Sequence, residues 1–169
     1  MPLIFTEESP GPAHIALWSV QEELSFFLDR LNLPQHDLDF VRSLHPRRAL
    51  EWSASRHLLA RMIGPDRALR CTKDAHGKPV IPGDPVELSI SHSYGMAAVL
   101  VADRRAGVDV QRRTPKIRRV RHKFVGTTEE PHIDPVRPDP FLQICWGAKE
   151  ALFKVYALGQ VDFRQHLFV

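Results

Sequence analysis

The middle of the chain, from Leu69 to Gln111, is broken into five short β-like runs separated by turn residues. The runs read LRCTKD, HGKPVI, VELSIS, MAAVLVA and AGVDVQ. Connections this short favour antiparallel pairing, because adjacent parallel strands need a crossover of about a dozen residues or more. The sequence therefore predicts an antiparallel meander, around which the rest of the fold has to be arranged.

Helical patterns precede this meander. Ser19 and Glu22 have the spacing of a capping box, Pro46 stands where a first helical turn tolerates proline, and Gly64 is a typical helix end. The expected elements are, in order, a strand at HIALWSV (14–20), a helix from the capping box to about Leu31, a short helix over 37–44 and a longer helix from Pro46 to Gly64.

Helical patterns also follow the meander. TPKIRRVRHKF (114–124) has helical spacing, and PHIDPVRPDP (131–140) predicts a loop because it holds four prolines. PFLQICWGAKEALFKVYALG (140–159) predicts a long helix. The apolar stripe expected on that helix consists of Phe141, Ile144, Cys145, Ala148, Leu152 and Val155. Separate helices and a local meander together predict an α+β fold.

Composition narrows the class of protein. The chain has 169 residues, of which 43% are hydrophobic, enough for one domain or for two small halves that share a core. Cys71 and Cys145 lie far apart and form no CxxC pair, so neither a disulfide framework nor a zinc cluster is indicated. No basic leader with a sustained apolar segment and no run of eighteen apolar residues is present. A cytoplasmic protein that neither spans a membrane nor is secreted is expected.

Positive charge is concentrated in one stretch. The net charge is only +3, yet nine Lys and Arg residues lie between Arg104 and Lys123 with a single acid, Asp109. Such a patch concentrates polyanions, whether phosphates, an acidic protein or nucleic acid. A solvated basic helix face is the commoner outcome, so charge alone leaves these alternatives open.

Two acids on separate elements adjoin this positive charge. In a strand, Asp109 and Gln111 would share one face, and on the last helix Glu150 and Lys154 are four residues apart, opposite the apolar stripe. Taken singly, Glu150 and Lys154 are explained by an ordinary ion pair on a helix, which stabilises by about 0.2–0.5 kcal/mol. Asp109 is likewise explained by an ion pair with a neighbouring Arg. Taken together, acids and cations indicate a metal-bound phosphate ester, because magnesium is held by one or two protein carboxylates and by substrate phosphates.

Two further positions carry weaker signals. ELSISHS places His92 between two serines, but no GxSxG elbow is present, so a phosphate-donating histidine is preferred to a hydrolase triad. A structural histidine at a strand end is the alternative. HGKP is a turn that projects Lys78, and by itself it is most often a solvated turn.

In order along the chain, GKPVIP, SISHS, GVDVQ and WGAKEALFK resemble the motifs of the 4'-phosphopantetheinyl transferases of the two-lobed, surfactin-synthetase-activating type. The resemblance runs from about Arg48 to the C-terminus, and WGAKEALFK is its strongest piece. It implies a pseudo-twofold α+β fold of two similar halves, each with antiparallel strands and a long packed helix. Here the halves would be 1–103 and 104–169, with coenzyme A bound between them.

The resemblance also implies roles by position. Asp109 and Glu150 would hold Mg²⁺, or Mn²⁺ in its place, and Gln111 would be a third metal ligand. Glu150 would also be the base that deprotonates the acceptor serine, and Lys154 would contact the coenzyme A phosphates and assist the departing group. Further coenzyme A phosphate contacts would come from Lys78, His92, Arg56 at the 3'-phosphate, and Arg48 with Arg47 beside it.

This sequence departs from the family pattern in two places. Gln111 stands where the motif usually has glutamate, and an amide oxygen can coordinate magnesium but carries no charge. Family members also commonly continue with further strands after the segment that corresponds to VDFRQHLFV. A compact or incomplete second half is therefore expected.

The implied reaction transfers the phosphopantetheine arm of coenzyme A to a serine of an apo acyl or peptidyl carrier protein and releases 3',5'-ADP. The basic run Arg112–Lys123 would then attract the acidic carrier. A degenerate homologue that binds coenzyme A or a carrier without catalysis is the second hypothesis, and a nucleic-acid surface is a distant third. A monomer without membrane or nucleic-acid partners is expected, and the sequence does not name the carrier or its pathway.

Overall fold

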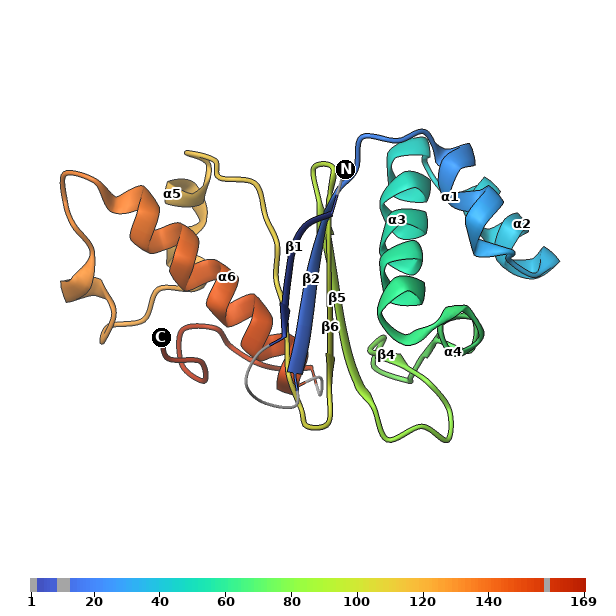
Figure 1. The fold of residues 1–169 in the computed structure, drawn as a ribbon. Helices are drawn as coiled ribbons and strands as arrows, with labels where there is room; N and C mark the ends of the chain where they lie inside the picture. Colours follow the sequence, from blue (N-terminus) through green and yellow to red (C-terminus); the bar gives the residue numbers. More distant parts are fainter. Residues whose placement is uncertain (1–2, 9–12, 157–158) are drawn as a thin grey trace.

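A four-stranded antiparallel sheet stands between two groups of helices in the computed structural model, which describes residues 3–8, 13–156 and 159–169 (Figure 1). The strand order is β1-β2-β6-β5. The strands are β1 (Leu3–Glu8), β2 (Ala13–Ser19), β5 (Glu87–Ser93) and β6 (Met96–Ala102). Helices on both sides of a small antiparallel sheet confirm the α+β class.

The centre of the sheet joins two hairpins that are distant in sequence. β5 and β6 pair from Glu87↔Ala102 to Ser93↔Met96, and β6 pairs with β2 along its whole length. Tyr94 and Gly95 turn the β5–β6 hairpin with φ of 48° and 81°. Positive φ at both positions is the geometry of a tight two-residue hairpin turn, and glycine adopts it more easily than tyrosine does.

The predicted five-strand meander is only partly correct. Its third and fourth runs form β5 and β6, but the first two form a separate two-stranded sheet, β3 (Thr72–Lys73) with β4 (Pro79–Val80). The fifth run, 106–111, is not a strand. The sheet is completed instead by β2 and β1, which the local pattern of the meander could not indicate.

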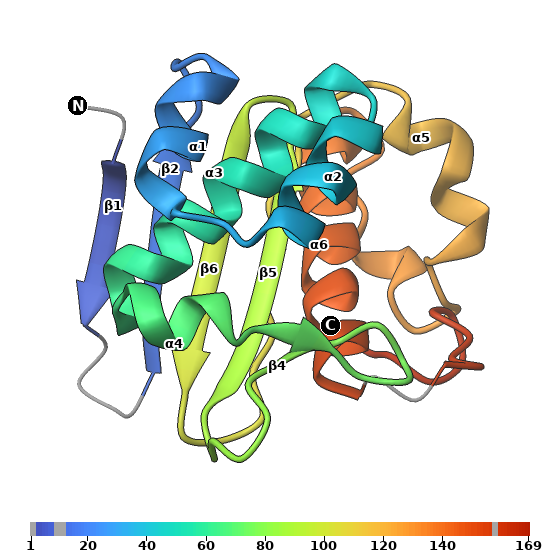
Figure 2. The same cartoon turned by 90° about the vertical axis from the view of Figure 1, so that its right-hand side faces the viewer.

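The first group of helices covers one face of the sheet (Figure 2). Its members are α1 (Leu24–Leu31), α2 (Gln35–Ser43), α3 (Pro46–Ile63) and α4 (Pro65–Leu69). The main core lies between α3 and the sheet, where Phe27, Leu58, Leu59, Ala97 and Val99 are almost fully buried.

The helix bounds agree with the sequence at α3 but not at the start of α1. Pro46 and Gly64 delimit α3 as predicted. The predicted Ser19–Glu22 capping box is absent, because α1 begins at Leu24 and has no side-chain cap. The Glu22 carboxylate instead accepts a hydrogen bond from the Trp18 indole at 3.2 Å.

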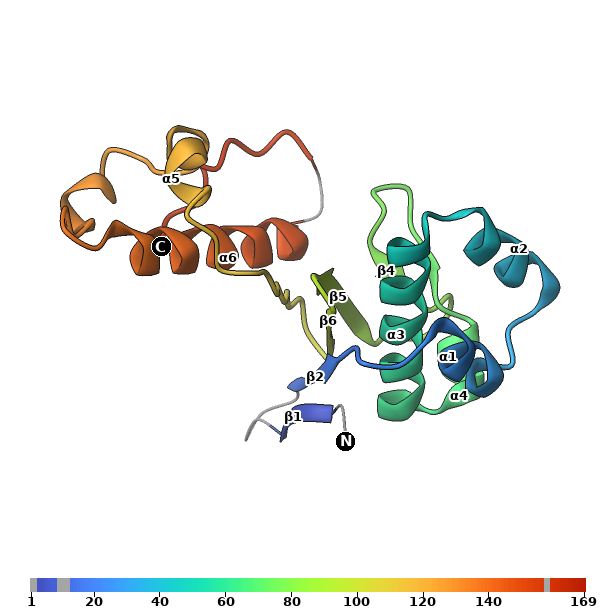
Figure 3. The same ribbon diagram turned by 90° about the horizontal axis from the view of Figure 1, so that it is seen from above.

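The second group of helices lies on the other side of the sheet (Figure 3). It contains α5 (Ile117–Val120), the 3₁₀ turns η1 (Arg121–Lys123) and η2 (Glu130–His132), and α6 (Pro138–Tyr156). A second apolar cluster, with Phe124, Leu142 and Cys145 at its centre, holds them together. Helical spacing in 114–124 is confirmed, whereas the predicted loop is shorter than expected because α6 already begins at Pro138.

Each predicted half therefore contains one long helix, α3 in the first and α6 in the second. Among the described residues, however, strands occur only in the first half. Residues 104–156 and 159–169 contain no strand. Each apolar cluster lies within one predicted half, with the main core before Arg104 and the second after it. The boundary between 1–103 and 104–169 and the pseudo-twofold relation stay predictions.

The predicted apolar stripe of α6 is only partly correct, because Cys145 is buried as expected but other members are exposed. Ile144 and Leu152 are 69% and 40% exposed, whereas Leu142, Cys145 and Lys149 form the buried face. Lys149 is fully buried because Nζ donates to the carbonyl oxygens of Phe124 (2.6 Å) and Phe163 (2.8 Å) and to Glu129 Oε2 (2.6 Å). With all three donors satisfied, a lysine can occupy a buried position outside the predicted stripe, and the buried face of α6 shifts accordingly.

Both cysteines are buried and free. Burial raises the pKa of the Cys145 thiol to about 11, so this thiol stays protonated near neutral pH. None of the helices in the described ranges is both long and apolar enough to cross a membrane.

Candidate active site

The extended segment Gly107–Gln111 carries the first candidate acid and lies over the sheet without joining its ladder. The backbone N–H of Val108 donates to Ser89 Oγ at 3.0 Å, and that of Val110 donates to Ser91 Oγ at 3.2 Å. Because strand side chains stand out of the sheet plane, this bonding places the segment on the face of β5 and not beside its edge. Alternate residues of the segment, Val108 and Val110, thus bond to alternate residues of β5, as in an extended chain, although the segment does not form a strand of the sheet.

Asp109 meets α6 through Lys154. Lys154 Nζ donates to Asp109 Oδ1 and to the Val108 carbonyl oxygen, both at 2.8 Å. Ser91 Oγ also donates to Asp109 Oδ1, at 3.0 Å. In the described part of the chain, Lys154 thus forms its ion pair with Asp109 and not with Glu150, its neighbour one turn earlier on α6.

Glu150 is the second acid of this cluster and is half-buried. Burial raises the pKa of its carboxyl, the negative charge of Asp109 raises it further, and the positive charge of Lys154 opposes both effects. The structure therefore brings Asp109, Glu150 and Lys154 together from two elements. A carboxylate with a raised pKa beside a second carboxylate is a candidate proton acceptor.

The donor set fits a hard divalent cation. The described residues contain no group of three or more His, Cys, Asp or Glu side chains placed to hold a metal. Mg²⁺ and Mn²⁺ need fewer protein ligands than that, because water and phosphate oxygens complete their shells. Asp109 and Glu150 could supply two such ligands, and a cation between them would offset the repulsion that contributes to the raised Glu150 pKa.

A cleft beside this cluster carries a second lysine. Lys78 and Lys154 line the same cleft, with Leu88, Ser89 and Phe153 between them. Asp74 shapes the turn that projects Lys78, because its Oδ1 accepts the backbone N–H groups of His76 and Lys78, both at 2.9 Å. The Lys78 ammonium is paired with Glu87. Lysines from both predicted halves therefore face one hollow.

An open groove begins on the other side of the Asp109–Lys154 pair. It runs between residues 107–115 and α6, and Asp109, Gln111, Gln143 and Gly147 line it. The exposed side chain of Ile144 lies at its wall. The Asp109–Lys154 pair is thus reached from two hollows, because Lys154 lines the cleft and Asp109 lines the groove.

His92 faces away from this cluster. Neighbouring strand residues point to opposite faces, so Ser91 meets Asp109 while His92 meets α3. His92 Nδ1 lies 3.1 Å from Glu51 Oε2, and Arg47 Nε donates to Glu51 Oε1 at 3.1 Å. The structural alternative for His92 therefore has a named partner, a buried glutamate that sequence reasoning missed.

Tyr94, also missed, lies at the hairpin tip next to this group. The Arg47 guanidinium stacks 4.1 Å from the centre of the Tyr94 ring, and Arg112 lies 5.2 Å from it. Arg47 comes from α3 and Arg112 directly follows the Asp109 segment. The tyrosine therefore bridges the two predicted halves at this end of the sheet.

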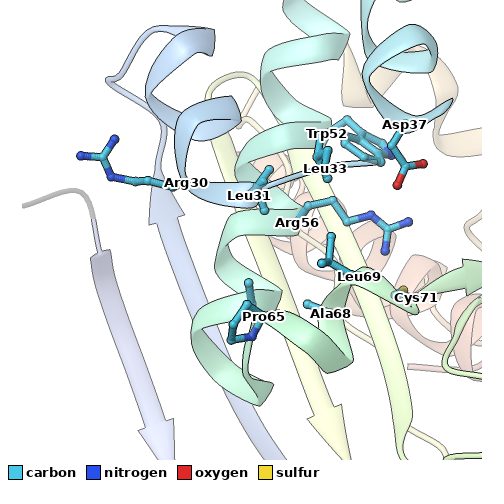
Figure 4. Close-up of a pocket in the computed structure, with 11 residues that line it drawn as sticks. Arg30, Leu31, Leu33, Asp37, Trp52, Arg56, Pro65, Ala68, Leu69 and Cys71 are labelled. Atoms are coloured by element: carbon cyan, nitrogen blue, oxygen red, sulfur yellow. The ribbon is translucent and has the colours of Figure 1, made fainter. Parts of the chain in front are cut away.

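Arg48 and Arg56 are not brought to the carboxylates. Arg48 is exposed at the start of α3. Arg56 lines a separate pocket among α1, α3 and α4, where its guanidinium lies near Trp52 and points to the side on which Asp37 lies (Figure 4). Among the described residues, its buried Nη1 has no hydrogen-bond partner.

No family model matches the chain, and no curated protein matches it either. The description of the site therefore rests on its own geometry.

Proposed function

We propose that this protein is a phosphopantetheinyl transferase, which transfers the 4'-phosphopantetheine arm of coenzyme A to a serine hydroxyl of an acyl or peptidyl carrier protein. The observation that carries the proposal is the convergence of Asp109, Glu150 and Lys154 from two elements, where Lys154 lines a cleft shared with Lys78 and Asp109 lines an open groove. The sequence resemblance assigned the reaction to these same three residues.

The chemistry needs positioning, charge neutralisation and a base, and it needs no covalent nucleophile. Glu150 accepts the proton of the serine hydroxyl as the serine oxygen bonds to the phosphorus of the phosphopantetheine. The bond from that phosphorus to the bridging oxygen breaks, and 3',5'-ADP leaves. Lys154 neutralises charge on the pyrophosphate. Asp109 and Glu150 would hold Mg²⁺ or Mn²⁺, which supplies further neutralisation of that charge when bound.

The two approaches to the site suit the two substrates. The cleft with Lys78 and Lys154 suits the anionic pyrophosphate of coenzyme A. The open groove beside Asp109 leaves room for the carrier to present its serine. Contacts from His92, Arg48 and Arg56 to the remaining phosphates stay predictions of the resemblance, because these three side chains face other surroundings.

The test is intact-mass spectrometry of a panel of apo carrier proteins incubated with the protein, coenzyme A and Mg²⁺. A metal-dependent gain of one phosphopantetheine group on a carrier supports the proposal. Glu150→Gln should lower kcat by about a hundredfold or more, the usual contribution of a general base, while coenzyme A still binds. Glu23→Gln, an exposed carboxylate on the sheet's other side, should leave kcat unchanged.

The competing hypothesis is a degenerate homologue that binds coenzyme A or a carrier without transfer. Coenzyme A binding measured by calorimetry, with no mass gain on any carrier, would favour this hypothesis over catalysis. Retention of full turnover by Glu150→Gln would instead remove Glu150 from its role as base.

A further inference from the structure

Gln111 stands where the resemblance places a metal ligand, and its amide nitrogen is bonded to the backbone of α6. Nε2 donates a hydrogen bond to the backbone carbonyl oxygen of Gln143 on α6, at 3.0 Å. A carboxylate cannot make this bond, because both it and a carbonyl oxygen are acceptors. The contact therefore distinguishes this glutamine from the glutamate that the family motif usually has.

Gly147 provides the space that this amide occupies. A Cβ on Gly147 would lie 3.0 Å from Gln111 Nε2, tighter than side chains normally pack. A glycine in the middle of a helix makes the helix less stable than an alanine would, so a structural reason for Gly147 is expected. The close approach of Gln111 supplies it, and the two residues form a complementary pair.

A second close contact lies one helical turn further along α6. A Cβ on Gly107 would overlap the Ala151 carbonyl oxygen, so the backbone of the segment lies directly against the helix. The two contacts, Gln111 with Gly147 and Gly107 with Ala151, are four residues apart on both the segment and the helix. Asp109 is midway between them on the segment, and Glu150 lies between them on α6.

We propose that Gln111 is a positioning residue that clamps the Asp109 segment to α6 and so sets the position of Asp109 in the metal site. The clamp continues through Gln143, whose Oε1 accepts the backbone N–H of Thr114 at 3.1 Å. The clamp itself rests on these contacts alone. Its consequence for the metal rests on the proposed function.

A double-mutant cycle in melting temperature, on the protein without metal or substrate, tests the clamp. Gln111→Ala should lower Tm by about 2–4 °C. Gly147→Ala should also lower Tm, although alanine favours a helix, because its Cβ displaces the amide. Combined with Gln111→Ala, Gly147→Ala should be neutral or stabilising, since its Cβ fills vacated space. Gln21→Ala, an exposed glutamine, is the control, and equal Gly147→Ala shifts in both backgrounds would refute the clamp.

Mn²⁺ affinity of the same four proteins, measured by electron paramagnetic resonance with saturating 3',5'-ADP, tests the second part without requiring turnover. Gln111→Ala should weaken Mn²⁺ binding by about tenfold, the usual cost of losing a group that orients a ligand. The double variant should return to within about twofold of wild type. A double variant as weak as Gln111→Ala would make Gln111 a ligand and overturn this part.

The two measurements separate failure of the inference from failure of the proposed function. A wild-type protein that binds no Mn²⁺ overturns the metal site and the proposed function with it. Coupled melting temperatures in that case would still support the clamp, whereas uncoupled ones with normal Mn²⁺ binding would overturn the clamp and spare the function.

Discussion

At the scale of single residues, the protonation state of Glu150 decides whether the proposed reaction can begin. Burial is the largest cause of its raised pKa, followed by the charge of Asp109, with Lys154 opposing. A base acts in its deprotonated form, so activity should increase as the pH rises through the Glu150 pKa, and bound Mg²⁺ should move that increase to lower pH because its charge favours the carboxylate.

We expect Asp109→Asn to lower the pKa of Glu150, because it removes a like charge, and Lys154→Met to raise it, because it removes an opposite one. The measurement is a carboxyl ¹³C NMR titration of the metal-free protein, which does not depend on turnover. Asp29→Asn, an exposed acid on α1, is the matched control. If the Glu150 pKa were the same in wild type and in all these variants, the charges of Asp109 and Lys154 would have no effect on it.

Residue contacts could be predicted where both partners carried a recognisable signal. Asp109, Glu150 and Lys154 were singled out by motif and spacing, and they meet. The partner of His92 could not be predicted, because Glu51 is 41 positions away and an acid inside α3 resembles any other helix acid. The serines beside His92 were not assigned a role once a hydrolase triad had been rejected, and no local pattern indicates that the hydroxyls of Ser89 and Ser91 hold the Asp109 segment.

At the scale of elements, the buried ion pair of Lys149 and Glu129 fixes the orientation of α6. Burial alone would raise the pKa of Glu129, but hydrogen bonds from the Gly126 N–H, Lys149 and the Val169 N–H outweigh it and lower the pKa below its usual value. A folded-state pKa below the unfolded one stabilises the protein above the unfolded value. That stability is lost as the pH falls through the folded-state pKa.

We expect Lys149→Met to destabilise the protein by about 3–5 kcal/mol, because it leaves the Glu129 carboxylate buried without its cation. Adding Glu129→Gln should recover part of this loss. Glu129→Gln should also flatten the decrease in unfolding free energy between pH 7 and pH 3, measured by denaturant titration. An unchanged pH dependence would mean that Glu129 has the same pKa folded and unfolded.

Elements were predictable where their ends are local signals. Proline and glycine delimit α3, and its bounds agree with the sequence. The 106–111 run has strand-like alternation but finds serine hydroxyls in place of a neighbouring backbone, and no local pattern encodes that choice. The buried face of α6 was mispredicted because a lysine with three internal acceptors looks, in sequence, like a surface residue.

At the scale of the whole molecule, the basic run Arg112–Lys123 is less free than its charge suggests. Arg118 is paired with Asp139, and Arg121 with Glu130. The pairing raises the pKa of Arg118 and lowers that of Asp139. Charge reversal at Arg118 would therefore break an internal contact as well as change the surface, so Arg119, an exposed neighbour, is the better probe of a docking surface.

We expect Arg119→Glu to raise the KM for an acidic carrier about two- to fivefold, the range typical of one exposed charge, without changing coenzyme A binding. The effect should shrink as salt rises from 50 to 300 mM, because exposed charges are screened. Arg61→Glu on α3 is the control, since Arg61 is exposed, forms no ion pair among the described residues and gives the same change in net charge on the other side of the sheet. A general loss of attraction between the two proteins would raise the carrier KM equally in both variants, whereas a docking surface at the basic run would raise it only for Arg119→Glu. Equal KM values for both variants and wild type would remove the basic run from carrier recognition and leave the groove beside Asp109 as the surface to probe next.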